Sequence, residues 1–193
     1  MPYKGRKKRV INKKKFALTC NILHSSHFIF LFFTIFANNM TKTEEQNQKD
    51  EFYMHRALDE AHAALEAGEI PIGAVVVCRD RIIARAHNLT ETLTDVTAHA
   101  EMQAITMAAN QLGGKYLTEC TLYVTVEPCV MCAGALGWAQ VPRIVYGAPD
   151  EKRGYQLYAP KAFHPKAKII GGILEEECRQ LMVEFFKQLR VKN

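Results

Sequence analysis

The 193-residue chain has few of the features that mark secreted or membrane proteins. Its six cysteines form no disulfide framework, because only Cys129 and Cys132 stand close together. Free thiols of this kind fit a reducing cytoplasm better than an oxidising compartment. The longest strongly apolar run, Phe28–Phe36, is too short to span a bilayer comfortably as a helix. We therefore expect a cytoplasmic protein that does not act at a membrane.

Residues 1–39 contain no Asp or Glu but carry eight Lys and Arg residues. This basic stretch and the apolar run after it resemble a signal peptide, although no convincing small-residue cleavage site follows. Met40 then precedes a polar stretch that is typical of a cytosolic N-terminus. We expect residues 1–39 to be an extension outside the working protein and residues 40–50 to be a flexible polar lead-in. Export is the alternative interpretation.

The rest of the chain lacks an excess of positive charge. Outside residues 1–39, 17 basic residues stand against 20 acidic ones, so the net charge is negative. Any binding of nucleic acid must therefore depend on a local patch. No internal repeat, linker or low-complexity segment interrupts residues 51–193, which we expect to form one domain.

Apolar periodicity predicts alternating helices and strands over this domain. Helices are expected at 51–67, 98–112, 129–139 and 175–190, and strands at 74–78, 82–86, 121–126, 143–147 and 168–170. Helices that alternate with strands in this order indicate an α/β protein, a three-layer α/β/α fold around a central mixed five-stranded sheet.

Two short motifs carry the chemistry. His99-Ala100-Glu101 supplies one imidazole and one carboxylate, and Pro128-Cys129-Val130-Met131-Cys132 supplies two thiolates three residues apart. One nitrogen and two sulfur ligands suit a catalytic zinc ion whose fourth position stays open for water. Each motif begins an expected helix, so two positive helix ends would converge on the metal. We predict His99, Cys129 and Cys132 as ligands of one zinc ion.

Glu101 is left over beside this centre. Zinc lowers the pKa of a bound water to about 7, and Glu101 would move protons between that water and the substrate. Two other interpretations of the cysteine pair are a redox couple and half of a structural zinc site. A structural site would need a fourth ligand, for which Cys78 and Cys120 are the candidates. Glu127 is expected to have a structural role.

The His-x-Glu and Pro-Cys-x-x-Cys pair is a known signature of zinc nucleobase deaminases. With its surroundings, it resembles the bacterial tRNA-specific adenosine deaminases, within the cytidine and deoxycytidylate deaminase superfamily. The likeness runs from about Phe52 to Arg190. It rests on residues 71–77, 87–88, 97–101, 122–135 and 147–154, the last of which fit the family pattern Gly-Ala-x-Asp-x-Lys-x-Gly.

The resemblance implies hydrolysis of the wobble adenosine to inosine in the anticodon stem-loop of an arginine tRNA, by a homodimer. It also implies which residues bind substrate. Asn88 would hydrogen-bond the flipped adenine through its donor and its acceptor, and the main-chain N–H of Ala100 would meet the base or its water. Asp150 would contact the preceding ribose. In the C-terminal tail, Phe186, Lys187 and Arg190 would contact the anticodon loop.

Some residues depart from the family pattern. Val96 replaces the usual proline, Leu89 replaces a usual basic residue, and the tail is less basic. Trp138 is similar to a feature of the related guanine deaminases, so a free guanine or cytosine deaminase with the same zinc centre is one alternative. A non-catalytic RNA-binding module stabilised by zinc is another, which the intact Glu101 disfavours. Two of the predicted substrate contacts also have a purely structural interpretation. Asn88 would then be a turn residue, and Phe186 would be a core residue.

Overall fold

The computed structural model describes residues 26–192, so the basic stretch of the predicted extension lies outside the described residues. The chain divides into two compact units, residues 1–46 and residues 47–193, and the second contains both motifs. Helix α2 (Ser26–Glu66) is the first described element. In the described part of the chain, no helix is both long enough and apolar enough to cross a membrane.

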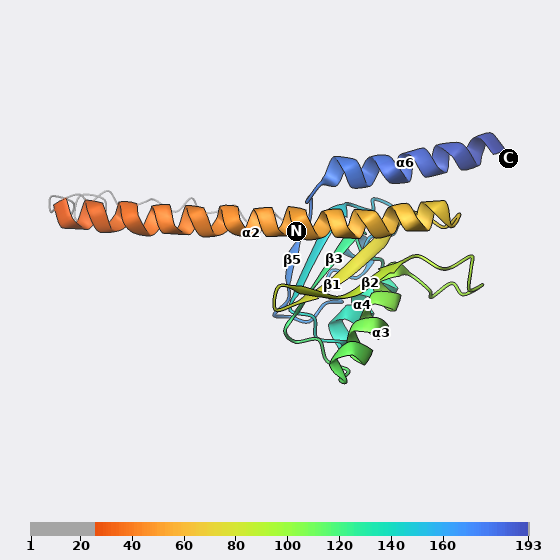
Figure 1. Ribbon diagram of the computed structural model, residues 1–193, viewed down its shortest axis with the longest axis horizontal. Helices are drawn as coiled ribbons and strands as arrows, with labels where there is room; N and C mark the ends of the chain where they lie inside the picture. The colour runs from red at the N-terminus through yellow and green to blue at the C-terminus, as the bar shows by residue number, and fades with distance from the viewer. Residues whose placement is uncertain (1–25, 193) are drawn as a thin grey trace, which may run out of the picture. The chain divides into compact units, whose positions relative to one another are not determined.

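A mixed five-stranded sheet forms the middle of the second unit, as predicted (Figure 1). Its strands are β1 (Gly73–Cys78), β2 (Arg81–His87), β3 (Cys120–Val126), β4 (Arg143–Ala148) and β5 (Lys168–Ile170), arranged in the order β2-β1-β3-β4-β5. β1 pairs antiparallel with both β2 and β3, whereas β3, β4 and β5 run parallel. The central strands β1, β3 and β4 are almost entirely buried, because helices cover both faces.

The helices form the outer layers of the predicted α/β/α fold. α3 (Ala100–Leu112) and α4 (Val130–Trp138) pack on one face with the short α5 (Tyr155–Tyr158), and residues 53–61 of α2 and the start of α6 (Glu175–Lys192) pack on the other (Figure 1). α3 ends at Gly113, which adopts the left-handed conformation of a helix cap. The sequence did not predict α5, whose single turn is too short to show a helical period.

Residues 40–50, expected to be a flexible lead-in, are helical in the structure and belong to α2. The stretch is rich in Glu, Gln and Lys, which are good helix formers. Its last residue, Asp50, is buried to 1% exposure and bonded to the sheet. The helix therefore begins before Glu51, where apolar periodicity predicts its start, and a tertiary contact holds Asp50 on the sheet.

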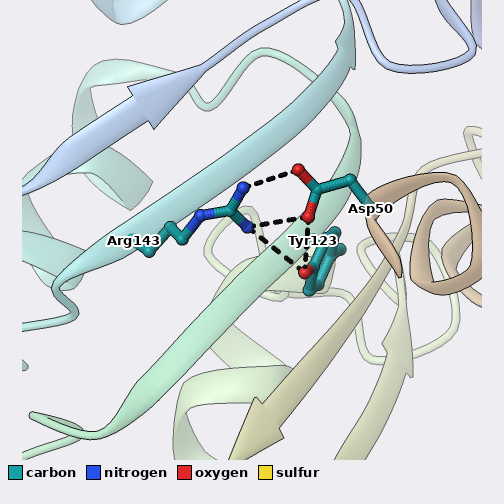
Figure 2. A network of polar contacts seen from close by, with 3 residues as sticks. All are labelled: Asp50, Tyr123 and Arg143. Atoms are coloured by element: carbon teal, nitrogen blue, oxygen red, sulfur yellow. Dashed lines mark hydrogen bonds and ion pairs between the residues drawn. The ribbon is translucent and has the colours of Figure 1, made fainter. Parts of the chain in front are cut away.

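Asp50 is the centre of a buried polar network between α2 and the sheet (Figure 2). Arg143 at the start of β4 donates from Nη1 to Asp50 Oδ1 at 2.9 Å and from Nη2 to Oδ2 at 2.5 Å. The hydroxyl of Tyr123 on β3 donates to Asp50 Oδ1 at 2.9 Å. The bidentate ion pair with Arg143 and the hydrogen bond from Tyr123 together compensate the desolvation of the buried Asp50 carboxylate. The network joins α2 to β3 and β4 on the face away from α3 and α4.

We expect Arg143→Met to lower the free energy of unfolding by about 3 kcal/mol, because it leaves Asp50 buried without its cation. Tyr123→Phe, which removes one neutral donor, should cost about 1 kcal/mol. Urea unfolding of the two variants and the unchanged protein measures both values. A loss below 1 kcal/mol for Arg143→Met would show that the pair does not hold α2 on the sheet.

Candidate metal centre and active site

The two motifs begin two neighbouring helices, as predicted. His99 is the N-cap of α3, with φ −68° and ψ 154°, and Cys129 is the N-cap of α4, with φ −71° and ψ 173°. Neither side chain caps its own helix, so both are available to a ligand. Cys132 lies in the first turn of α4 and is fully buried. The backbone thus presents three ligand atoms at two positive helix ends.

The three side chains meet at one point. His99 Nδ1 lies 3.7 Å from Cys129 Sγ and 3.5 Å from Cys132 Sγ. All three ligand atoms lie within 4.8 Å of one another. In a tetrahedral zinc site with ordinary bond lengths, a nitrogen and a sulfur ligand stand about 3.6 Å apart. The geometry therefore fits zinc bound through Nδ1 of His99 and both thiolates.

The pKa values of the two ligand cysteines are shifted in opposite directions. Hydrogen bonds from Cys132 and His99 lower the pKa of Cys129 to about 4. The hydrogen bond to Cys129, together with burial, raises the pKa of Cys132 far above its usual range. Cys129 raises the pKa of His99 in turn. These shifts favour Cys129 as the thiolate of the metal-free pair, and a bound metal ion would hold both sulfurs as thiolates.

Glu101 lies in the first turn of α3, two residues from His99, and is 4% exposed. Burial raises the pKa of its carboxyl to about 7. A carboxyl group with this pKa both takes and gives protons near neutral pH, which is the property of a general acid and base. The structure therefore puts the predicted proton carrier beside the predicted ligands.

Asn88 directly follows β2 and lies next to the start of α3. The main-chain N–H of Leu89 donates to the carbonyl of Ala98 at 2.9 Å, which holds Asn88 beside the entry to α3. The side chain is 2% exposed, and its Nδ2 donates to Glu69 at 3.0 Å and to Thr90 at 2.8 Å. Both amide hydrogens are therefore used within the protein. This differs from the expectation that donor and acceptor would both serve the base, since only Oδ1 is left.

Asp150 begins a turn that lies against the metal ligands. Cys129 forms an isolated bridge with Gly154, and the N–H of Tyr155 donates to the carbonyl of Pro128 at 2.9 Å. Asp150 Oδ1 accepts from the N–H groups of residues 152 and 153, which closes the turn. The predicted ribose contact is thus next to the site, but one carboxylate oxygen already serves the backbone.

Glu127 anchors the same turn, in line with its expected structural role. Its Oε2 accepts from the N–H of Asp150 and its Oε1 from the N–H of Gln156, both at 3.1 Å. A Cβ on Gly154 would lie 2.5 Å from this carboxyl, so only glycine allows the close approach. Glu69 and Glu127 are thus two buried carboxylates that organise loops around the centre. Sequence reasoning did not identify Glu69, although an acidic residue directly before the apolar lead-in to β1 was a signal.

The tail residues lie elsewhere. Phe186, Lys187 and Arg190 are exposed on the last turns of α6, whereas Phe185 is buried. α6 packs on the face of the sheet opposite α3 and α4 (Figure 1). The structure therefore does not bring the tail together with the metal ligands of the same chain.

Among the described residues, no fourth protein ligand joins His99, Cys129 and Cys132. Cys78 and Cys120 pair with each other across β1 and β3, and neither joins the ligand group. Among the described residues, His99, Cys129 and Cys132 form the one cluster with metal-binding geometry. Three protein ligands and an open position are the arrangement of catalytic zinc.

Residues 47–148, more than half of the chain, match the zinc-binding region of cytidine and deoxycytidylate deaminases. The chain belongs to this deaminase family. The matched region contains Glu101 as well as His99, Cys129 and Cys132, which are positioned to hold the zinc ion of this family. The hydrolytic deaminase interpretation of the two motifs is confirmed.

Individual members narrow the comparison. The chain is 48% identical over 150 residues to the tRNA-specific adenosine deaminase of Bacillus subtilis. The match covers 75% of this chain and 93% of the relative. A solved structure of a tRNA:A34 deaminase, studied for A-to-I editing at the wobble position, matches 67% of this chain and 98% of its own, with a TM-score of 0.63 and 43% identity. The guanine deaminase of Nitrosomonas europaea matches with a TM-score of 0.63 but 26% identity, over 70% of this chain and 83% of its own.

Proposed function

We propose that this deaminase converts the wobble adenosine of a tRNA anticodon loop to inosine, with release of ammonia. The observation that carries the proposal is the convergence of His99, Cys129, Cys132 and a buried Glu101 at two helix ends. The 48% identity to a tRNA-specific adenosine deaminase supports RNA, rather than a free base, as the substrate. A single-stranded loop lets the target base leave the stack and enter a pocket.

The protein groups divide the reaction between them. Zinc, when bound, supplies an activated water for attack on C6 of adenine. Glu101 would accept one proton from this water and pass it to the ring nitrogen. It would then accept the second proton from the new C6 hydroxyl and pass it to the amino group, which leaves as ammonia. The positive ends of α3 and α4 favour the thiolate forms of the two cysteines when the metal is bound. Asn88 Oδ1 and the main-chain N–H of Ala100 hold the base in position.

The contacts to the rest of the RNA come from the edge of the site and from the tail. Asp150, which stands in the turn beside Cys129, contacts the ribose of the nucleotide before the target. Phe186 offers an exposed ring on which a base stacks, and Lys187 and Arg190 attract phosphates. An anticodon stem-loop of arginine tRNA is the proposed partner. The proposed setting is the cytoplasm, with residues 1–39 outside the working protein.

Ammonia release from four substrates tests this function. The substrates are an anticodon stem-loop with a wobble adenosine, free guanine, free cytosine and adenosine. We expect release from the stem-loop alone, at equal rates for the full chain and for a chain that starts at Met40. Release only from a free base would discard the RNA contacts, and zinc-loaded protein that releases none would be an RNA-binding module instead.

We also propose a homodimer that associates through α4. The outward side of this helix carries Val130, Gly134 and Trp138 at successive turns, and Trp138 is 86% exposed. A Cβ on Gly134 would meet nothing within 4 Å, so packing within the chain does not require glycine there. An exposed apolar stripe with a glycine in its middle allows the helix of a second copy to approach closely. Trp138 lies at the far end of α4 from the ligand Cys129, so it does not line the metal site of its own chain.

Gly134→Arg is expected to convert the dimer to a monomer, because the new side chain enters the interface without a clash in its own chain. Gly114→Arg is the matched control, since Gly114 is exposed and equally open. Light scattering after size exclusion measures the mass of each variant. A monomeric unchanged protein, or a dimeric Gly134→Arg variant, would contradict the proposed interface.

A further inference from the structure

Glu69 is a fully buried carboxylate that takes no part in the proton transfers described above. Every hydrogen bond that it accepts comes from one short segment, residues 88–92. Its Oε1 accepts from the N–H of Thr92 at 2.7 Å, and its Oε2 accepts from the N–H of Glu91 at 3.1 Å. The Asn88 amide and the Thr90 hydroxyl also donate to Oε2, at 3.0 and 3.4 Å.

This carboxylate stays charged inside the protein. Burial raises the pKa of Glu69, but the N–H groups of Thr92 and Glu91 and the Thr90 hydroxyl outweigh it and lower the pKa below its usual value. Among the described residues, no Lys, Arg or His forms an ion pair with Glu69, so neutral donors alone stabilise the charge. A buried charge is costly unless hydrogen bonds satisfy it, so this position has a strict geometry.

The charge determines which way the Asn88 amide faces. A carboxylate only accepts hydrogen bonds, so the amide atom at Glu69 must be Nδ2. The second hydrogen of Nδ2 goes to Thr90 Oγ1 at 2.8 Å, whose own hydrogen faces Glu69. No donor among the described residues reaches Oδ1. Both hydrogens of the Asn88 amide are therefore used within the protein, and Oδ1 is the atom left to bind a ligand.

We infer that Glu69 is a positioning residue that locks the amide of Asn88 with Oδ1 toward the bound base. The inference rests on the proposed function, in which Asn88 holds the adenine. A neutral amide at position 69 would remove the lock, since Gln offers a donor where Glu offers an acceptor. In Glu69→Gln, the short hydrogen bond from the N–H of Thr92 would keep the amide oxygen of Gln at the Oε1 position. The NH₂ group of Gln would then face Asn88 and favour an Asn88 amide turned with Oδ1 toward position 69.

Reciprocal substitutions test the lock. We expect Glu69→Gln to lower kcat/KM for the stem-loop by about 10- to 100-fold. Asn88→Asp should lower kcat/KM further, because two carboxylates would then stand 3.0 Å apart. In the double variant Glu69→Gln, Asn88→Asp, position 69 offers the donor and position 88 is the acceptor-only group. Its kcat/KM should therefore be at least about tenfold higher than that of Asn88→Asp. Zinc content should match across the set. The melting temperature should fall in Asn88→Asp, because two buried carboxylates then face each other, and should recover in the double variant.

A second readout separates this inference from the proposed function. In ¹⁵N-labelled full-length protein, the Asn88 side-chain amide is assigned by its loss in Asn88→Asp. Its hydrogens should exchange slowly in the unchanged protein and fast in Glu69→Gln. Slow exchange in a protein that deaminates no RNA would refute the function and leave the lock in place. Fast exchange in the unchanged protein, full activity of Glu69→Gln, or no recovery in the double variant would overturn the lock.

Discussion

Glu101→Gln is expected to retain zinc and the fold while kcat falls by about 10²- to 10⁴-fold. The amide has the shape of the carboxyl group but cannot carry protons between water, ring nitrogen and ammonia. Because Glu101 is buried and its pKa is raised to about 7, neutral Gln places no new charge in the interior. Ammonia release and zinc content, measured on the same preparation, check both halves of the prediction.

Glu119→Gln is the control for this experiment, because Glu119 is an exposed carboxylate that pairs with Arg79 on the surface. It should keep full activity. If Glu101→Gln turned over at the unchanged rate, the proton carrier would be another group. If it lost zinc, its role would be to support the metal centre.

Cys132→Ser is expected to abolish zinc retention and all turnover. A serine hydroxyl stays protonated where a thiolate is needed, and two ligands do not hold the metal. The folded state also loses the stabilisation that bound metal supplies, about 4 kcal/mol when free zinc is a thousandfold above its dissociation constant. Metal analysis of the purified variant and thermal melting with and without a chelator measure these effects.

Cys178→Ser gives a matched control, because Cys178 is equally buried but packs between α6 and the sheet, away from the ligands. It should cost some stability through its polar hydroxyl and keep both zinc and activity. Chelator should then lower the melting temperature of Cys178→Ser but not of Cys132→Ser. Stoichiometric zinc in purified Cys132→Ser would contradict the assigned ligand set.

The fold layers and the metal ligands were predictable because their signals are local. Buried strands such as Gly73–Cys78 are continuous apolar runs, and a proline before Cys129 indicates the start of a helix. Ligands at two helix starts therefore follow from spacing alone. The same local signals placed the start of α2 wrongly, since the bond between Asp50 and Arg143 joins residues 93 positions apart.

Glu127 was expected to have a structural role, but the loops that the two supporting carboxylates hold could not be predicted, for a related reason. Glu69 and Glu127 act on segments 19 to 29 residues further along the chain, and only the folded structure shows which loops they hold. The orientation of the Asn88 amide likewise depends on Glu69, 19 positions earlier in the chain, as well as on the nearby Thr90. Motif spacing identifies the groups that meet the metal, whereas their positioning is a property of tertiary packing.

The most direct test of the proposed function locates the product within an intact tRNA. A transcript with adenosine at the wobble position is incubated with the zinc-loaded protein, and reverse transcription then reads any inosine as guanosine. We expect conversion at the wobble adenosine and at no other adenosine, with almost none for Glu101→Gln. An unchanged wobble adenosine in the presence of zinc-loaded, folded protein would contradict the assignment to tRNA.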